Sequence, residues 1–376
     1  MVFGRFCLGL GLDSLGLFSC GSKGVFWFWA LCLHRYSGID PVMDPPLSFS
    51  GCRQRIESSM EFALFSLYDH GHDHFSPRID LDHVPFKLQS HGIYVIRTYY
   101  LLTKPGIILG NLITTGAGFA LASRGHLDVR LFVPMLIGLG CVIASACVFN
   151  NYIDRELDKK MSRTKTRALA RGIISHRSAL LFAIVLGLAG IAVLGIWTNL
   201  LATAIAAIGF FVYVVLYSFW KTKKTYATLV GSIAGALPPV IGYCAVSNRL
   251  DVGAILLFSI LVLWQMPHFF SIAMFRLDDY SAANIPVLPV EKGSRVTKIH
   301  MALYILAFTI TTGLMTVCGY TGLAYLLVTA PLGLIWLWLS IKGFKADSDP
   351  VWARQMFRLS LIIITVFSLM IFNDTP

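Results

Sequence analysis

The chain has 376 residues, of which 56% are hydrophobic and only 14% are charged. An ordinary soluble globular protein carries about 25% charged residues, so this composition excludes a chain made only of soluble domains. The formal net charge of +11 would suit a nucleic-acid-binding protein. However, the basic residues gather in the connections between apolar runs, so we expect no nucleic-acid partner.

Residues 1–90 differ in composition from the rest of the chain. Residues 1–35 are rich in Gly, Phe and Leu, and their apolar run Val25–Leu33 is too short to span a bilayer. Residues 36–90 are polar and contain proline, which is typical of disorder. We therefore expect a poorly structured extension over 1–90, either a targeting segment or a start-site artefact, and a membrane domain over 91–376.

Apolar runs of about 18–22 residues recur from residue 106 onward, and each is long enough for a helix to cross a hydrocarbon core roughly 30 Å thick. The runs lack the apolar–polar alternation of barrel strands, so they indicate helices. The sequence therefore predicts an all-α, polytopic membrane protein with about nine transmembrane helices. The expected spans are 106–123, 131–150, 178–197, 200–219, 227–246, 252–271, 300–318, 323–341 and 358–373.

Basic residues are distributed unevenly among the connections. The connection 155–177 carries eight Lys or Arg residues, whereas 198–199 and 319–322 carry none. Because connections rich in Lys and Arg stay on the cytoplasmic side, residue 104 is expected in the cytoplasm or the mitochondrial matrix. The same pattern predicts that the C-terminus lies across the membrane.

The end of the second predicted span carries three oxygen-bearing side chains. Asn150, Asp154 and Asp158 occupy positions i, i+4 and i+8, so on a helix they form one stripe. Arg163 and Arg167 follow four residues apart, a spacing at which both could bind phosphate oxygens. Amide and carboxylate oxygens bind hard cations such as Mg²⁺. The motif indicates a metal-bridged diphosphate site, and ordinary helix-end ion pairs are the alternative.

A second acidic cluster, Arg276–Tyr280, follows the sixth span and lies on the same predicted membrane face. Asp278 and Asp279 are adjacent, so they point about 100° apart on a helix, and one of them is expected to be a surface charge. Asp154 and Asp279 lie four spans apart, which suggests a pseudo-repeat of two four-helix halves followed by a ninth helix. Repeats of this kind commonly place the site between the halves.

Three further side chains are candidates on position alone. Lys104 begins the first span and Lys221 ends the fourth, where each could contact diphosphate or only a lipid headgroup. His268 precedes Asp278 by ten residues, or about 15 Å along a continuous helix, and therefore lies inside the membrane. It could ligate a haem iron, shuttle a proton or simply pack.

Five stretches carry a resemblance to a known family, and they are spread over most of the membrane region. They are LTKPGIILGNLIT (102–114), CVFNNYIDRELDKKMSRTKTR (147–167), GSIAGALPPVIGYCAV (231–246), WQMPHFFSIAMFR (264–276) and DYSAANIPVLPV (279–290). With these stretches, the region 95–372 resembles the UbiA superfamily of intramembrane prenyltransferases. Within the superfamily, it looks most like the branch that farnesylates protohaem IX.

The resemblance implies a helix bundle with a central cavity. It also implies transfer of the farnesyl group of farnesyl diphosphate to a vinyl group of haem b, assisted by Mg²⁺. The implied metal ligands are Asn150, Asp154, Asp158 and Asp279. The implied catalytic residues are Asp154, Asp158, Asp279 and Arg163. The implied substrate-binding residues are Asn150, Lys104, Asn111, Arg167, Lys221, His268, Arg276 and Tyr280.

The resemblance favours a bacterial inner membrane with the active site facing the cytoplasm, and the alternative is a mitochondrial inner membrane with the site facing the matrix. Membrane lipid is an expected partner, with haem A synthase or terminal oxidase assembly as candidate protein partners. The chain departs from the superfamily at Ala283, four residues after Asp279, where a second Asp is often found. It also departs at Lys221-Thr222-Lys223, so the basic residue that contacts diphosphate stays open.

Two other functions remain as alternatives. The first is a UbiA-type prenyltransferase that acts on an aromatic quinone precursor. The second is a secondary transporter with inverted repeats. Because the acidic residues gather at one membrane face rather than at the bilayer midplane, the sequence favours an enzyme over a transporter.

Overall fold

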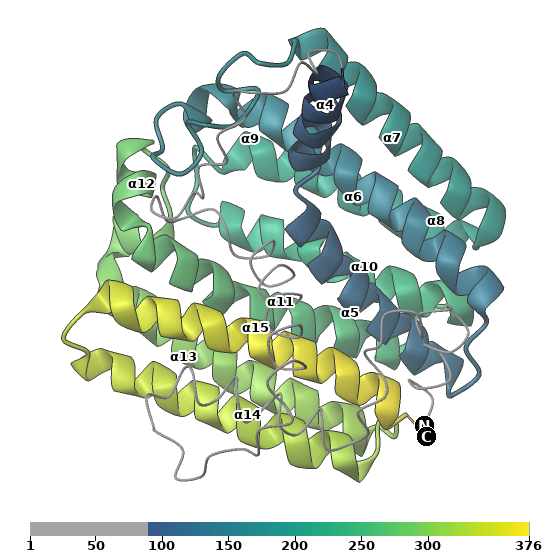
Figure 1. Ribbon diagram of the computed structural model, residues 1–376. Coiled ribbons are helices and arrows are strands. Elements are labelled where there is room, and N and C mark those ends of the chain that lie inside the picture. The colour runs from purple at the N-terminus through teal and green to yellow at the C-terminus, as the bar shows by residue number, and fades with distance from the viewer. Residues whose placement is uncertain (1–88, 376) are drawn as a thin grey trace, which may run out of the picture. The chain divides into compact units, whose positions relative to one another are not determined.

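A computed structural model describes residues 89–375, which belong to one compact unit, 75–376 (Figure 1). The described residues form helices joined by short connections, with no strand among them. The extension predicted over 1–90 lies outside the described residues, apart from its last two residues. These two begin helix α4, Gln89–Leu102, which the sequence did not predict.

Nine helices within residues 89–375 are long and apolar enough to cross a membrane, and they confirm the nine predicted spans. They are α5 (Pro105–Ser123), α6 (Val129–Asp158), α7 (His176–Trp197), α8 with η3 and α9 (Leu200–Trp220), α10 (Ala227–Ser247), α11 (Val252–Phe275), α13 (Leu288–Val317), α14 with η4 (Leu323–Lys345) and α15 (Asp349–Asn373). The short helix α12 spans Leu277–Ala282.

Several helices differ from the prediction in their bounds. α6 continues to Asp158, well past the expected end at residue 150, so the whole acidic stripe is helical. α13 begins at Leu288 rather than near 300, and Gly293 interrupts it with a left-handed φ of 79°. α11 ends at Phe275 because Arg276 leaves the helical region, with φ −118° and ψ 27°. The expected continuous helix from His268 to Asp278 is therefore wrong.

The fourth span is not one regular α-helix. It consists of α8 (Leu200–Phe211), the π-helix η3 (Val212–Tyr217) and the short α9 (Ser218–Trp220). A π-helix inserts a residue into the helical turn, and such insertions are frequent at functional sites. This irregularity directly precedes Lys221.

Helix contacts recur between the two predicted halves. α5 packs against α6 and α6 against α7, just as α10 packs against α11 and α11 against α13. α8 packs against α10, just as α14 packs against α15. α15 also contacts α5 and α11, and Figure 1 shows it beside both helices. This pattern agrees with two four-helix halves and a ninth helix.

The contact between α5 and α10 depends on glycine. A Cβ atom at Gly118 would collide with the carbonyl oxygen of Pro239, and one at Gly242 would collide with that of Thr115. Small residues allow membrane helices to approach this closely. Gly110, on the same helix α5, has nothing within 4 Å of the position that a Cβ would take. The two helices therefore approach closely around Thr115 and Gly118 of α5, and not at Gly110.

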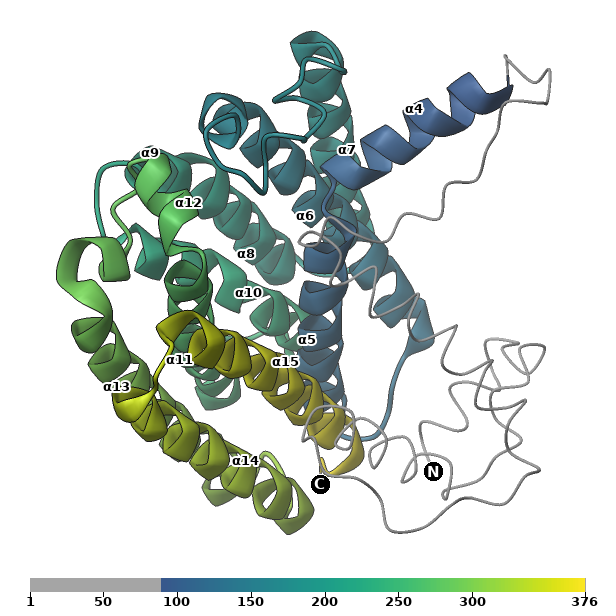
Figure 2. The same cartoon turned by 60° about the vertical axis from the view of Figure 1, so that its left-hand side comes forward.

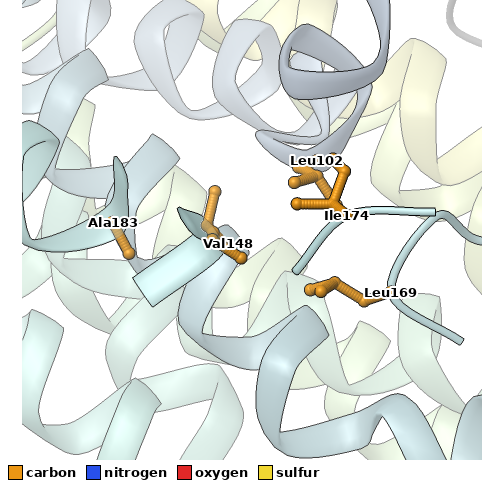
Figure 3. Packing of buried hydrophobic residues seen from close by; sticks show 6 residues of the cluster. Leu102, Val148, Leu169, Ile174 and Ala183 are labelled. Atoms are coloured by element: carbon orange, nitrogen blue, oxygen red, sulfur yellow. The ribbon is translucent and has the colours of Figure 1, made fainter. Parts of the chain in front are cut away.

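The loop between α6 and α7 lies at the same end of the bundle as α9 and α12, as both ribbon views show (Figures 1 and 2). Leu102, the last residue of α4, belongs there to a buried cluster that includes Val148 of α6, and it lies beside Ile174 (Figure 3). The loop contributes Leu169 and Ile174 to this cluster. Apolar packing therefore holds α4 and the loop against the end of α6, where the predicted site residues begin.

Candidate active site

The last turns of α6 carry the predicted stripe of oxygen-bearing side chains. Asn150, Asp154 and Asp158 stand at successive turns, and Asn150 Nδ2 donates to Asp154 Oδ2 at 2.9 Å. Asn150 and Asp158 are each only 4% exposed, and Asp154 is half-buried. Carboxylates at this depth are costly unless their charge is compensated. The stripe therefore needs basic side chains nearby to compensate the charge of its carboxylates.

Two lysines from different segments bind the first part of the stripe. Lys104, directly before α5, donates from Nζ to Asn150 Oδ1 at 2.7 Å. Lys221, directly after α9, is buried and forms an ion pair with Asp154. Lys223 is exposed. Among the basic residues left open after the fourth span, Lys221 is therefore the one that reaches the acidic stripe.

The Lys104 ammonium sits in a mixed electrostatic environment. Burial lowers its pKa to about 8, and the nearby Arg167 guanidinium lowers that pKa as well. The carboxylates of Asp154 and Asp158 oppose both effects. Together with its hydrogen bond to Asn150, this places the Lys104 ammonium among the charged groups of the stripe.

Arg163 and Arg167 lie in the loop that follows α6. Their spacing of four residues is not a helical one, because α6 ends at Asp158 and the loop forms turns. Arg167 Nη1 lies 2.9 Å from both carboxylate oxygens of Asp158. Arg163 makes no hydrogen bond or ion pair with any residue that the structure describes. Its guanidinium is thus available to an anionic ligand.

The second predicted cluster approaches Arg163. Burial lowers the pKa of the Arg163 guanidinium, and the charges of Arg167 and Arg276 lower it further. Burial raises the pKa of the Tyr280 phenol, and Arg163 opposes that shift. Arg276 also lies over the ring of Phe275, 5.5 Å from its centre. Basic residues from both halves therefore meet at this end of the bundle.

Ser162 joins the two acidic clusters. Asp279 on α12 accepts hydrogen bonds through Oδ1 from the backbone N of Ser162 at 3.0 Å and from Ser162 Oγ at 2.6 Å. Asp279 is half-buried, whereas the adjacent Asp278 is exposed. The prediction that one of these two carboxylates is a surface charge is confirmed.

The cluster carries more positive than negative charge. Its five basic side chains are Lys104, Arg163, Arg167, Lys221 and Arg276. Its three carboxylates are Asp154, Asp158 and Asp279. Buried and half-buried basic groups in excess attract polyanions, and Arg and Lys both bind phosphate oxygens. The arrangement suits a diphosphate.

The predicted metal ligands do not form a closed cage. Within residues 89–375, no three His, Cys, Asp or Glu side chains come together in a group that could hold a metal ion. Asn150 and Asp154 are in contact, but Asp158 is turned to Arg167 and Asp279 to the α6–α7 loop. Mg²⁺ commonly binds through one or two carboxylates together with substrate phosphates. The oxygen ligands present fit that mode rather than an all-protein site.

Two predicted substrate-binding residues make contacts elsewhere. His268 Nδ1 lies 2.8 Å from Ser360 Oγ, and its ring stacks on Trp264 with centroids 4.8 Å apart. Asn111 Nδ2 donates to the Ile107 carbonyl oxygen of its own helix at 2.7 Å. Neither side chain contacts the charged cluster in the part of the chain that the structure describes. A role for either in haem binding stays a prediction.

Sequence reasoning missed two residues of the site, Asn151 and Ser162. Both contact segments far away along the chain, so no local pattern could reveal them. Tyr213 and Tyr217 belong to the π-helix of the fourth span. The π-helix stacks their rings 5.5 Å apart, and the Lys221 ammonium lies 5.6 Å from the Tyr217 ring. The aromatic pair therefore borders the charged cluster.

Fold and site together define a multi-pass helical membrane protein with a cluster of basic and acidic side chains at one end of its bundle. The UbiA prenyltransferase family matches residues 111–362, and the chain belongs to this family.

Curated relatives are similar to this chain over nearly their whole length. A protein from Protochlamydia amoebophila, named protoheme IX farnesyltransferase, is 54% identical over 277 residues, which cover 74% of this chain and 98% of the relative. Proteins of the same name from Yersinia pseudotuberculosis serotype O:1b and Serratia proteamaculans are 52% identical over 281 residues. Those matches cover 74% of this chain and 95% of each relative.

Solved structures share the fold at much lower identity. A structure of digeranylgeranylglyceryl phosphate synthase gives a TM-score of 0.62 at 18% identity, covering 74% of this chain and 99% of that one. A UbiA homologue from Archaeoglobus fulgidus, bound to DMAPP and Mg²⁺, gives 0.57 at 16% identity, covering 73% of this chain and 99% of that one. At these identities the similarity concerns the fold alone.

Proposed function

We propose that this protein transfers the farnesyl group of farnesyl diphosphate to a vinyl group of protohaem IX (haem b), giving haem O and diphosphate. The observation that carries the prenyl-transfer step is the excess of basic groups around Asp154 and Asp158 at the end of an apolar bundle. The choice of haem b as the acceptor rests on the names of the relatives that are 52–54% identical.

The reaction needs a site that binds diphosphate more strongly as the allylic C–O bond breaks. Arg163 and Lys221 would bind the diphosphate oxygens and stabilise the negative charge that grows on the leaving group. Lys104 would add a third contact from the first span. Preorganised cations of this kind act most strongly in a site that excludes water.

Asn150, Asp154, Asp158 and Asp279 are the oxygen ligands that would hold Mg²⁺ together with the substrate phosphates. When bound, it would supply charge neutralisation on the leaving diphosphate. The carboxylates of the chain would orient the bound ion. Their partners, Lys221 and Arg167, would then be released to the phosphate oxygens.

The remaining chemistry is that of the farnesyl cation. The apolar helices would hold the farnesyl tail and keep water from the cation until a haem vinyl group attacks it. Water then adds to the resulting carbocation on the haem side and loses a proton, which leaves the hydroxyethylfarnesyl group. The rings of Tyr213 and Tyr217 border the charged cluster, and an aromatic face stabilises a nearby cation.

The protein would work in a bacterial inner membrane with this site on the cytoplasmic side. The basic connection 155–177 supports that orientation, because such connections stay in the cytoplasm.

The first test is an assay of membranes that contain the folded protein, with haem b, farnesyl diphosphate and Mg²⁺. Chromatography and mass measurement would detect a farnesylated haem, and its Mg²⁺-dependent formation is the expected result. Asp154→Ala and Asp158→Ala are expected to abolish turnover while the protein stays folded. Near-normal activity in either variant would contradict the assigned site. No product from the intact protein would favour an aromatic acceptor, to be tried in the same assay.

A further inference from the structure

Asn151 lies beside the site, but it faces a different segment. Adjacent helical residues point about 100° apart, so Asn150 and Asn151 reach different neighbours. Asn151 is 3% exposed, and its Nδ2 donates to the backbone carbonyl oxygen of Leu102 at 2.8 Å. Its Oδ1 accepts no hydrogen bond from the described residues. The amide nitrogen of Asn151 therefore binds the end of α4, and its buried amide oxygen has no partner among the described residues.

The carbonyl that Asn151 binds belongs to a constrained turn. Leu102 ends α4, and Pro105 begins α5. Between them, Lys104 has a left-handed backbone, with φ 54° and ψ 67°. A residue with a side chain holds this conformation only where its surroundings impose it. The hydrogen bond from Asn151 is a polar contact that ties this turn to α6.

The turn also determines where the Lys104 side chain points. Lys104 Nζ reaches Asn150 Oδ1 at 2.7 Å, so the same turn of α6 contacts both the backbone and the side chain of the 102–104 segment. The buried cluster that contains Leu102 and Val148 holds the segment against the bundle. Packing is non-directional, whereas a hydrogen bond to one carbonyl sets the register of the turn.

We propose that Asn151 is a positioning residue that acts through Lys104. By holding the Leu102 carbonyl, it fixes the left-handed turn and aims the Lys104 ammonium at the diphosphate site. The inference rests on the proposed function, in which Lys104 contacts the diphosphate. An apolar residue at this position would pack without leaving a buried unpaired oxygen, but it could not donate to the turn.

A double-mutant cycle tests this proposal through ligand binding, without the acceptor. The purified full chain is titrated with farnesyl diphosphate and Mg²⁺, and the dissociation constant is measured for the wild type, Asn151→Ala, Lys104→Met and the double variant. Each single change is expected to weaken binding roughly ten- to a hundredfold, which is typical of a lost charge-assisted hydrogen bond. The double variant is expected to bind no more weakly than Lys104→Met alone.

Asn199 provides the matched control. Its Nδ2 also crosses between helices to backbone carbonyls, at 2.7 Å from Cys244 O and 3.1 Å from Ala245 O. Asn199→Ala is expected to lower thermal stability. It should leave the dissociation constant within about twofold, because Asn199 contacts neither the charged cluster nor Lys104. If Asn151→Ala binds like the wild type, or if its effect multiplies with that of Lys104→Met, the proposal is overturned.

A second variant covers the case in which Asn151→Ala does not fold. Asn151→Ser is too short to reach Leu102, but its hydroxyl can bond the carbonyl one turn earlier, as Ser271 bonds Pro267 in α11. It is expected to fold and to weaken binding as Asn151→Ala would.

Failure of the proposed function gives a different result. In that case the wild type itself does not bind farnesyl diphosphate with Mg²⁺. The same cycle is then read with inorganic diphosphate and Mg²⁺, where a wild-type dissociation constant for Asn151→Ser overturns the proposal.

Discussion

Individual side chains in the charged cluster differ sharply in how they are held. Asp154 and Asp158 each face a basic partner, whereas Asp279 is held by the backbone and hydroxyl of Ser162. Arg163 and Arg276 have no such partner among the described residues. Only Arg167 and Lys221 are held in ion pairs with the stripe. A diphosphate at the proposed site would therefore find two guanidinium groups unpaired and would have to displace ion pairs only to reach Arg167 and Lys221.

The adjacent carboxylates on α12 give a matched pair for a test at this scale. Asp279→Ala removes the group that Ser162 orients and is expected to lower kcat/KM at least tenfold. Asp278→Ala removes an exposed charge in the first turn of α12, which contributes only a few tenths of a kcal/mol, so activity should stay within about twofold. Steady-state rates of haem farnesylation compare the two. Equal losses would show that α12 matters through its fold and not through Asp279.

The ion pair between Arg167 and Asp158 should appear in the stability of the protein. Arg167→Met leaves the buried Asp158 carboxylate without its partner, and breaking a fully buried pair costs about 3–5 kcal/mol. Because the Arg167 side chain is 21% exposed, the lower end of that range or less is expected. The exposed Arg171 provides the control, and Arg171→Met should leave the melting temperature in detergent unchanged. Restoration of stability in Asp158→Asn/Arg167→Met would identify the unpaired charge as the cause.

At the scale of helices, regular spacing predicted what lies within one element. The stripe from Asn150 to Asp158 is helical, as its period indicated. Features that depend on neighbours were not predictable from local sequence. They include the π-helix at Val212–Tyr217, the break at Arg276 and the reach of Ser162 to Asp279. Tertiary contacts can override local propensity, and the bond from Ser162 to Asp279 joins residues 117 positions apart.

The close approach of α5 and α10 leads to a prediction for the helix pair. Gly118→Ala places a Cβ atom against the Pro239 carbonyl, which must move the two backbones apart. Overpacking of this kind typically costs about 1–3 kcal/mol, so the melting temperature should fall. Gly110→Ala on the same helix meets open space and is expected to be neutral or stabilising by up to about 1 kcal/mol. Thermal unfolding in detergent compares the two variants, and equal behaviour would mean that the close contact does not limit stability.

For the whole molecule, the length of the apolar runs was the sequence feature that best predicted the fold. Nine spans were predictable because each run matches the thickness of a bilayer. The four-span separation of Asp154 and Asp279 also suggested the two halves, whose contacts recur in the structure. What sequence alone could not supply is the distance between the halves. The site depends on that distance, since Arg163 and Tyr280 come from different halves.

Membrane orientation can be tested with a cysteine that the chain already carries. Cys318 is exposed and follows α13, on the face opposite the basic α6–α7 loop, whereas Cys147 and Cys244 are buried. In intact bacterial cells, a membrane-impermeant maleimide is expected to label Cys318 from outside. Mass mapping identifies the labelled peptide, and Cys318→Ser serves as the control. Labelling of Cys318 only in inverted vesicles would place the site on the outer face and reverse the proposed orientation.

The contacts of α15 have a consequence for how the protein is made. α15 follows all other described helices in the chain, yet it packs against α5, the first span, and against α11. Ser360 on α15 accepts a hydrogen bond from Trp264 and bonds His268, both within α11. A ribosome that stalls before α15 leaves these two side chains facing lipid without polar partners, a costly state. The last helix to be synthesised therefore supplies polar partners to a helix inserted earlier, so α11 is complete only when the whole chain is.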